Sequence, residues 1–132
     1  MVTFGLGHAA LLVMLHAAGP SYAHLAQAHR LALALGLLAL ASLAVSAFKQ
    51  GSGKLFLPVC VYVAVLGVLG LTGLSLPAQA AIAVLPGLCA FLLSDLLIGI
   101  QSFTTRAQSA GWSVLIWLLY WIGLVWLLAG LT

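Results

Sequence analysis

Acidic side chains are almost absent from this sequence of 132 residues, in which Asp95 is the single Asp or Glu. Lys and Arg number four, the formal net charge is +3, and charged residues make up 4% of the chain against 65% apolar residues. So few charges exclude the surface of an ordinary soluble domain and leave no basic footprint for binding nucleic acid. The composition predicts an integral membrane protein, whose solvent is lipid.

Cysteine is also scarce. Cys60 and Cys89 both fall within apolar runs, at positions that we expect to lie at different depths. A disulfide between them is therefore not expected, and each is interpreted as a buried free thiol. A chain of this length predicts one compact unit, a single transmembrane helical domain over residues 1–132, rather than two domains.

Five apolar runs are long enough to cross a bilayer, which takes about 20 helical residues. They cover roughly residues 2–19, 25–48, 55–76, 78–101 and 110–131. The breaks between them contain turn residues or polar side chains, such as Gly19-Pro20-Ser21-Tyr22 and Lys49-Gln50-Gly51-Ser52-Gly53-Lys54. The sequence therefore predicts an all-α, polytopic bundle of five transmembrane helices.

The basic residues set the expected orientation of this bundle. Lys49, Lys54 and Arg106 lie in the second and fourth breaks, whereas the first break has only Arg30 and the third has none. Because cytoplasmic loops are enriched in Lys and Arg, we expect the N-terminus to be cytoplasmic. The expected location is a bacterial inner (cytoplasmic) membrane.

Asp95 lies inside the fourth apolar run, where a carboxylate is costly and indicates a functional site. At about 1.5 Å of rise per residue, His8 lies about 9 Å and Asp95 about 9–12 Å from the cytoplasmic ends of their helices. The same arithmetic gives about 11 Å for Tyr62 and about 15 Å for Tyr120. We therefore expect these four side chains to share one layer.

Other residues predict how the helices pack and bend. Gly67, Gly70 and Gly73 recur every three residues and would let a neighbouring helix approach closely. Pro86 removes a backbone donor in the fourth run, so we expect a kink and a carbonyl one turn earlier without its usual partner. Of the four tryptophans in the last run, only Trp112 is placed for an interfacial belt.

The stretch from Pro86 to Phe103 reads Pro-Gly-x3-Phe-x2-Ser-Asp-x7-Phe, which resembles the signature of the lysoplasmalogenase (YhhN-like) family of membrane hydrolases. Three further pieces are similar to family segments in order and spacing. They are Phe4-x3-His8, Leu57-Pro58-Val59 followed by Tyr62, and Tyr120. The resemblance covers nearly the whole chain and implies the C-terminal five spans of an eight-span member.

The sequence also departs from the family pattern. It has no counterpart of the Gly-Asp motif that precedes the His segment, so the chain is a shortened relative or lacks an upstream portion. Leu11 stands where the family has a tyrosine, Gly123 stands where it has a glutamine, and Tyr120 is the one tyrosine kept of a pair. The implied site therefore has one carboxyl group.

Resemblance to this family implies hydrolysis of the vinyl-ether bond of a lysoplasmalogen. That reaction needs an acid to protonate the β carbon, a negative charge to stabilise the resulting oxocarbenium-like cation, and a base to activate water. A carboxyl group shielded from water suits the first two tasks, and a histidine suits the third.

Asp95 and His8 are the expected catalytic residues. The residues expected to bind or orient the substrate are Tyr62, Ser94, Tyr120 and Phe103. We expect no metal and no cofactor.

The expected partner is a membrane lipid or lyso-lipid, whose phosphate would make weak contacts with Lys49, Lys54 or Arg106. The alternative function is that of a catalytically silent accessory subunit, packed against a larger membrane protein complex. In that interpretation Asp95 is a protonated carboxyl group hydrogen-bonded within the bundle, and His8 is a neutral histidine beside it.

Two further functions fit the sequence less well. A haem or chlorophyll carrier would use neutral histidine as a ligand, but paired histidines at matching depths on facing helices are not evident. His16, His24 and His29 are instead expected at or beside the outer interface. Transport is disfavoured because the five runs show no internal repeat and only one embedded charge.

Overall fold

The computed structural model describes residues 2–103 and 110–132, with side chains from residue 6 onward, and within these ranges it contains helices and turns but no strand. Its α-helices are α1 (Val2–Ala17), α2 (Ala28–Ser52), α3 (Phe56–Leu74), α4 (Ala78–Phe103) and α5 (Ala110–Leu131). Two short 3-10 helices, η1 (Tyr22–Ala26) and η2 (Gly53–Leu55), lie in the connections. The predicted all-α class is confirmed.

Three stretches of the described chain are long and apolar enough to cross a membrane, namely Ala28–Leu74, Ala78–Phe103 and Ala110–Leu131. The first stretch comprises α2, η2 and α3. In α1, the apolar segment Leu6–Ala17 is shorter than a full span. These helices support a membrane protein, while the count of five spans and the cytoplasmic N-terminus stay predictions. Arg106 lies outside the described residues.

The outer surface of the bundle is apolar. Large hydrophobic side chains such as Leu43 on α2 and Trp117 on α5 are more than 60% exposed. A soluble monomer rarely shows such extended apolar surface, but a lipid-facing one requires it. Both cysteines are free thiols, as predicted, but neither is buried as expected, because Cys89 is exposed on this surface and Cys60 is half-buried.

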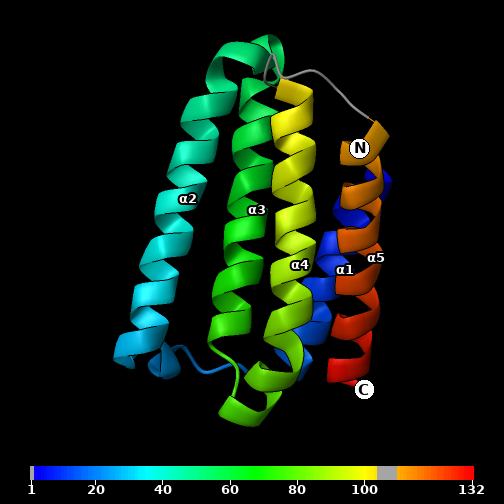
Figure 1. Ribbon diagram of the computed structural model, residues 1–132. Helices are drawn as coiled ribbons and strands as arrows, with labels where there is room; N and C mark the ends of the chain where they lie inside the picture. The colour runs from blue at the N-terminus through cyan, green and yellow to red at the C-terminus, as the bar shows by residue number, and fades with distance from the viewer. Residues whose placement is uncertain (1, 104–109) are drawn as a thin grey trace.

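The helices run alongside one another, as Figure 1 shows. Helix α2 packs on α3, α4 packs on both of them, and α5 packs on α4. The first helix, α1, packs mainly on α3. One end of the bundle, here called the lysine end, holds the α2–α3 junction with Lys49 and Lys54 and the C-terminal end of α4 (Figure 1). The opposite end holds the α1–α2 and α3–α4 connections.

Glycines bring α4 and α5 into backbone contact. A Cβ atom added to Gly123 would lie 2.7 Å from the backbone nitrogen of Phe91 and 2.9 Å from the carbonyl oxygen of Gly87. A Cβ atom on Gly130 would lie 2.7 Å from the carbonyl oxygen of Ala83. Such distances leave no room for a side chain, so the two helices can approach this closely only because glycine occupies both positions.

The predicted glycine stripe on α3 does not bring two helix backbones together. Gly70 is in contact with the side chain of Leu37 from α2, and Gly73 with the side chain of Leu88 from α4. At Gly67, an added Cβ atom would meet nothing within 4 Å. The stripe therefore accommodates side chains at two positions and leaves open space at the third.

Pro86 lies within α4, which continues through it from Ala78 to Phe103. The indole Nε1 of Trp126 on α5 donates a hydrogen bond of 2.9 Å to the carbonyl oxygen of Ala83, three residues before the proline. A neighbouring helix thus supplies a donor beside the place where proline interrupts the backbone ladder, which is how proline is tolerated in membrane helices.

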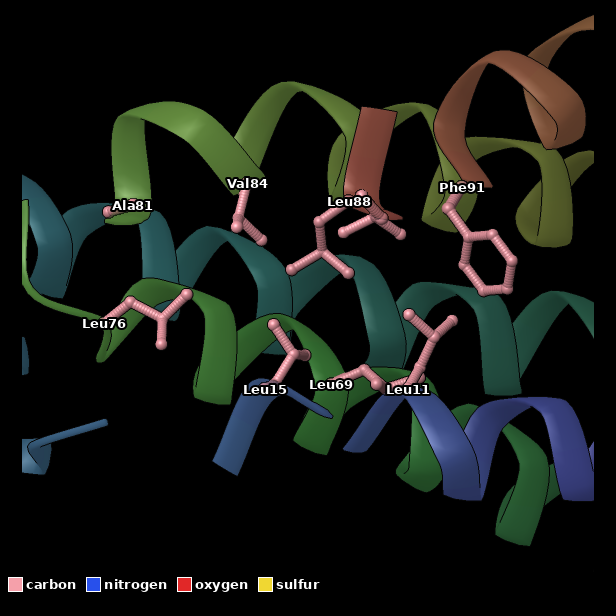
Figure 2. Packing of buried hydrophobic residues seen from close by; sticks show 9 residues of the cluster. Leu11, Leu15, Leu69, Leu76, Ala81, Val84, Leu88 and Phe91 are labelled. Carbon is pink, nitrogen blue, oxygen red and sulfur yellow. The ribbon is translucent and has the colours of Figure 1, made fainter. Parts of the chain in front are cut away.

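Two hydrophobic clusters fill the interior. The larger lies among α1, α3, α4 and α5 (Figure 2), and its buried residues are Leu11, Leu15, Leu69, Leu76, Ala81, Val84, Leu88, Phe91 and Leu127. The smaller lies toward the lysine end among α2, α3 and α4, and its buried residues are Ala44, Phe48, Val59 and Val63. Asp95 is one helical turn from Phe91, on the side of the smaller cluster.

At the opposite end, polar side chains cap the last turn of α3. The guanidinium of Arg30 is buried, and its Nη1 donates to the carbonyl oxygens of Leu74 at 2.8 Å and Leu76 at 2.5 Å. His24 is half-buried, with Nδ1 3.0 Å from the carbonyl oxygen of Ser75. Arg30 lies in the first turn of α2. Its side chain therefore supplies donors to carbonyl groups at and just beyond the end of α3, which a helix end leaves without partners.

Candidate functional site

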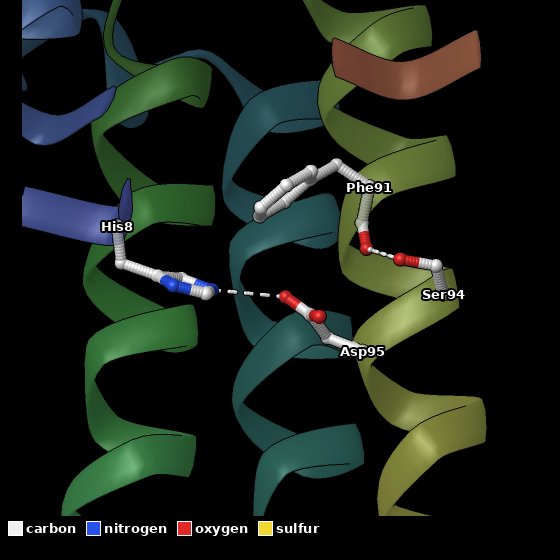
Figure 3. A network of polar contacts seen from close by, with 4 residues as sticks. All are labelled: His8, Phe91, Ser94 and Asp95. Atoms are coloured by element: carbon white, nitrogen blue, oxygen red, sulfur yellow. Dashed lines mark hydrogen bonds and ion pairs between the residues drawn. The ribbon is translucent and has the colours of Figure 1, made fainter. Parts of the chain in front are cut away.

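His8 and Asp95 meet in the interior of the bundle. The Nε2 atom of His8 lies 3.0 Å from Oδ2 of Asp95, as Figure 3 shows. The two residues are 2% and 1% exposed, and 87 positions separate them in the sequence. The contact between α1 and α4 agrees with the common depth predicted for these side chains.

The second carboxyl oxygen of Asp95, Oδ1, is buried and accepts no hydrogen bond from the residues that the structure describes. A buried polar atom in that state is costly, so it calls for an explanation. Tyr62 on α3 lies close enough to interact electrostatically with Asp95, and its ring meets His8 edge-on with centroids 5.5 Å apart. The three side chains form one polar group in an apolar interior.

A cavity of about 620 Å³ adjoins this group, between α2, α3 and α4. His8, Tyr62, Asp95 and Ser102 are the polar side chains among its described lining residues, and the rest of the wall is apolar. The volume falls in the range of about 300–1,000 Å³ that is typical of small-molecule pockets. The cavity suits a ligand that is mainly hydrocarbon and has one reactive group placed beside His8 and Asp95.

The lining of this cavity extends along α4 on both sides of Asp95, and the two parts are here called its longer and shorter arms, by their extents along α4. Along α4 the lining begins at Leu92 and ends at Phe103. At 1.5 Å of rise per residue, the lining on α4 extends about 12 Å from Asp95 toward the lysine end and about 4.5 Å the other way. Phe48 and Phe103, with ring centroids 5.7 Å apart, lie in the longer arm at the lysine end.

The remaining predicted residues lie in different places. Phe103 lines the cavity at the end of its longer arm. Ser94 is buried, and its hydroxyl donates to the carbonyl oxygen of Phe91 at 2.7 Å, so it supports α4 without lining the cavity. Tyr120 contacts the ring of Phe91 at 5.6 Å, and Phe91 in turn contacts His8 at 5.3 Å. Among the described contacts, Tyr120 therefore reaches the His8–Asp95 pair only through Phe91.

Sequence reasoning missed the wall that α2 contributes. Ala41, Ala44 and Phe48 line the cavity. Their spacing of three and four residues places them on one face of a helix, and two small residues on that face leave room beside it. This pattern was the available signal, but α2 is apolar all round, so the pattern does not stand out from the other faces.

This arrangement can perform acid–base chemistry away from water. The 3.0 Å contact between His8 and Asp95 lets a proton move directly between the imidazole and the carboxyl group. An ionised carboxylate in such a site stabilises a cation strongly, because little solvent screens it. No lysine or arginine is found among the described lining residues, so no fixed positive charge opposes a cation there.

Apolar helices, a buried histidine–carboxyl pair and an adjoining apolar cavity define a polytopic helical membrane protein with a candidate acid–base site. The chain belongs to the YhhN family, whose model matches residues 1–131. The predicted relationship to this lysoplasmalogenase-like family is confirmed, while the correspondence to the last five spans of a longer member stays a prediction. No curated protein and no solved structure matches the chain.

Proposed function

We propose that the protein hydrolyses the vinyl-ether bond of a lysoplasmalogen-type lyso-lipid in a bacterial cytoplasmic membrane. The observation that carries this proposal is the buried His8–Asp95 pair in the wall of an apolar cavity. Membership of the YhhN family supports a lipid context for the site. The products are a fatty aldehyde and a glycerophospho head group.

The first step uses Asp95 as the acid. Its carboxyl group gives a proton to the β carbon of the vinyl ether, and the electron pair of the double bond forms the new C–H bond. The carbon attached to oxygen becomes an oxocarbenium-like cation. The carboxylate left behind stabilises this cation, in a wall that is otherwise apolar.

The second step uses His8 as the base. Water adds to the cationic carbon, and its released proton passes to the imidazole. In the hemiacetal that forms, the hydroxyl group loses its proton as the C=O bond of the aldehyde forms. The bond to the glycerol oxygen breaks and that oxygen takes up a proton, so this collapse needs no net proton. The proton on His8 returns to Asp95 across their 3.0 Å contact, so one water is consumed and both groups are restored. A single carboxyl group suffices in this scheme because His8 takes the role of a second one.

The two arms of the cavity suit the two ends of the substrate. The longer arm extends toward the lysine end, where Lys49 and Lys54 are exposed. A head group placed along this arm would bring its phosphate to those lysines at the membrane surface, where a charged group stays solvated. Tyr62 and Phe103 would then line the path between the reacting bond and the head group.

An accessory subunit without activity is the alternative. That role needs no space at the His8–Asp95 layer, which would be expected to be packed shut. A cavity of about 620 Å³ that reaches the pair favours the enzyme. Co-purification at fixed stoichiometry with a larger membrane complex, without aldehyde release, would favour the subunit.

The test is aldehyde release from a lysoplasmalogen by the protein purified in mild detergent. We expect turnover by the wild type and a loss of about 100-fold or more in Asp95→Asn, which cannot donate the proton. Ser42→Ala is a matched control, because the Ser42 hydroxyl bonds only to its own helix on the exposed side of α2. Retained turnover in a folded Asp95→Asn variant would remove Asp95 from the mechanism, and an inactive wild type would overturn the proposal.

A further inference from the structure

The short arm of the cavity ends beside a glycine on α3. Gly67 lines the cavity, and a Cβ atom added there would meet nothing within 4 Å. The next glycine along α3, Gly70, is covered by Leu37, whose Cδ2 atom would lie 2.5 Å from an added Cβ. The arm therefore continues as far as Gly67 and is closed beyond it by Leu37.

This arm, which is the shorter one along α4, is apolar. It extends five residues along α3 from Tyr62 to Gly67, which is about 7.5 Å, and three residues along α4 from Asp95 to Leu92, which is about 4.5 Å. Leu37, Leu66 and Leu92 form its wall. A phosphate or ammonium group would lose its hydration there without a polar partner, so the arm accepts hydrocarbon only.

An unpaired polar atom marks the point at which the arm begins. Oδ1 of Asp95 is buried without a hydrogen bond from the described residues, on a carboxyl group that lines the same cavity. A ligand that reacts at this oxygen and enters the arm must therefore place its hydrocarbon part directly beyond the reacting bond.

The cavity is also open at its side. Leu40 on α2 and Val61 on α3 line the cavity and are 48% and 57% exposed. A chain longer than the arm can therefore pass out of the bundle beside these residues into surrounding lipid, which is as apolar as the wall it leaves.

We propose that Gly67 is a specificity-determining residue, which keeps open a short arm for the aliphatic carbons next to the scissile vinyl ether while the rest of the chain stays in the bilayer. This inference rests on the proposed function for the identity of the reacting bond. It predicts that the protein distinguishes substrates by the chain segment beside the vinyl ether and tolerates differences in total chain length.

The first experiment compares Gly67→Ala, Gly67→Val and Gly67→Leu with Gly36→Leu. Gly36 is a matched control, because it also has open space at its Cβ position but lies on the exposed surface of α2 outside the cavity lining. We expect Gly67→Leu to lower kcat/KM for a long straight-chain vinyl-ether lyso-lipid by about 10-fold or more, as added carbons do in an apolar pocket. An ethenyl ether of the same head group has no chain beyond the double bond and should lose nothing.

The second experiment needs no turnover. A saturated alkyl-ether lyso-lipid with a fluorescent head group, which cannot be hydrolysed by this route, is titrated into each variant in nanodiscs. We expect its affinity to fall by about 10-fold in Gly67→Leu, less in Gly67→Ala, and not at all in Gly36→Leu. Thermal unfolding of each variant checks that the fold is retained.

The outcomes separate this inference from the proposed function. A wild type that binds the alkyl-ether probe in a Gly67-dependent way but releases no aldehyde would overturn the reaction and keep the arm. Turnover and binding that are the same in wild type and Gly67→Leu would overturn the inference and keep the reaction. An equal loss for the long-chain and ethenyl substrates would also overturn the inference, since it would indicate damage to the catalytic pair.

Discussion

His8 on α1 is hydrogen-bonded to Asp95 on α4 at 3.0 Å, although α1 packs mainly on α3. The side-chain contact therefore joins two helices across the interior of the bundle. Because both groups are almost fully buried, loss of this hydrogen bond is costly to either of them. The pair accordingly contributes to stability as well as to the proposed chemistry, and the two contributions can be measured separately.

A double-mutant cycle measures the structural contribution of this pair. We expect His8→Phe and Asp95→Leu each to destabilise the protein by about 1–3 kcal/mol, because each removes a buried hydrogen bond from the group that remains. The double variant should lose less than the sum of the two, with a coupling energy of about 0.5–3 kcal/mol. The measurement is reversible unfolding in detergent. Strictly additive losses would contradict the contact.

Substitution of Gly123 tests the close backbone contact between α4 and α5. Gly123→Ala would place a Cβ atom 2.7 Å from the backbone nitrogen of Phe91, so the helices must separate. We expect destabilisation of about 1–3 kcal/mol, as for other overpacked sites. Gly36→Ala is the control, because it meets nothing within 4 Å and should stabilise α2 by about 0.5–1 kcal/mol through helix propensity. Equal thermal stability of the two variants would rule out the close approach.

Trp126 tests whether α5 supports the backbone near Pro86. Trp126→Phe keeps most of the ring but removes the Nε1 donor to the carbonyl oxygen of Ala83. We expect a loss of about 0.5–1.5 kcal/mol in unfolding free energy. Trp121→Phe provides the comparison, since Trp121 is exposed and its indole donates to no residue in the described ranges. The prediction fails if both variants unfold alike.

Arg30 tests the polar cap at the opposite end of the bundle. Arg30→Met replaces the aliphatic part of the arginine side chain with an unbranched apolar chain. It leaves the carbonyl oxygens of Leu74 and Leu76 without their charged donor. We expect a loss of about 1.5–3 kcal/mol, the range for hydrogen bonds to charged groups. Lys54→Met, at an exposed position, should change stability little. A melting temperature for Arg30→Met that matches the wild type would show that the cap is dispensable.

The helices could be predicted from the sequence because each needs only a long apolar run. The runs predicted over 78–101 and 110–131 correspond closely to α4 and α5. The predicted break at Lys49 was less accurate, because α2 continues to Ser52 before η2 turns the chain. Polar side chains at a helix end can reach the interface without interrupting the backbone.

The site was predicted in part, because depth along a helix follows from residue number whereas rotation about its axis does not. The common depth of His8, Tyr62 and Asp95 corresponds to the group that they form. Tyr120 has a similar depth, but its ring lies behind Phe91. Because α5 is apolar on every side, its sequence does not indicate which face is inward. For the same reason, the glycine contact between α4 and α5 could not be predicted.

The distance along the chain between His8 and Asp95 has a consequence for biogenesis. During synthesis α1 leaves the ribosome before α4, and the carboxyl group that bonds to His8 follows 87 residues later. Until α4 enters the membrane, the imidazole has no acidic partner from this chain. A nascent chain that stalls before that point therefore lacks the His8–Asp95 hydrogen bond, which distinguishes an incomplete product from a finished one for the proteases that remove misassembled membrane proteins.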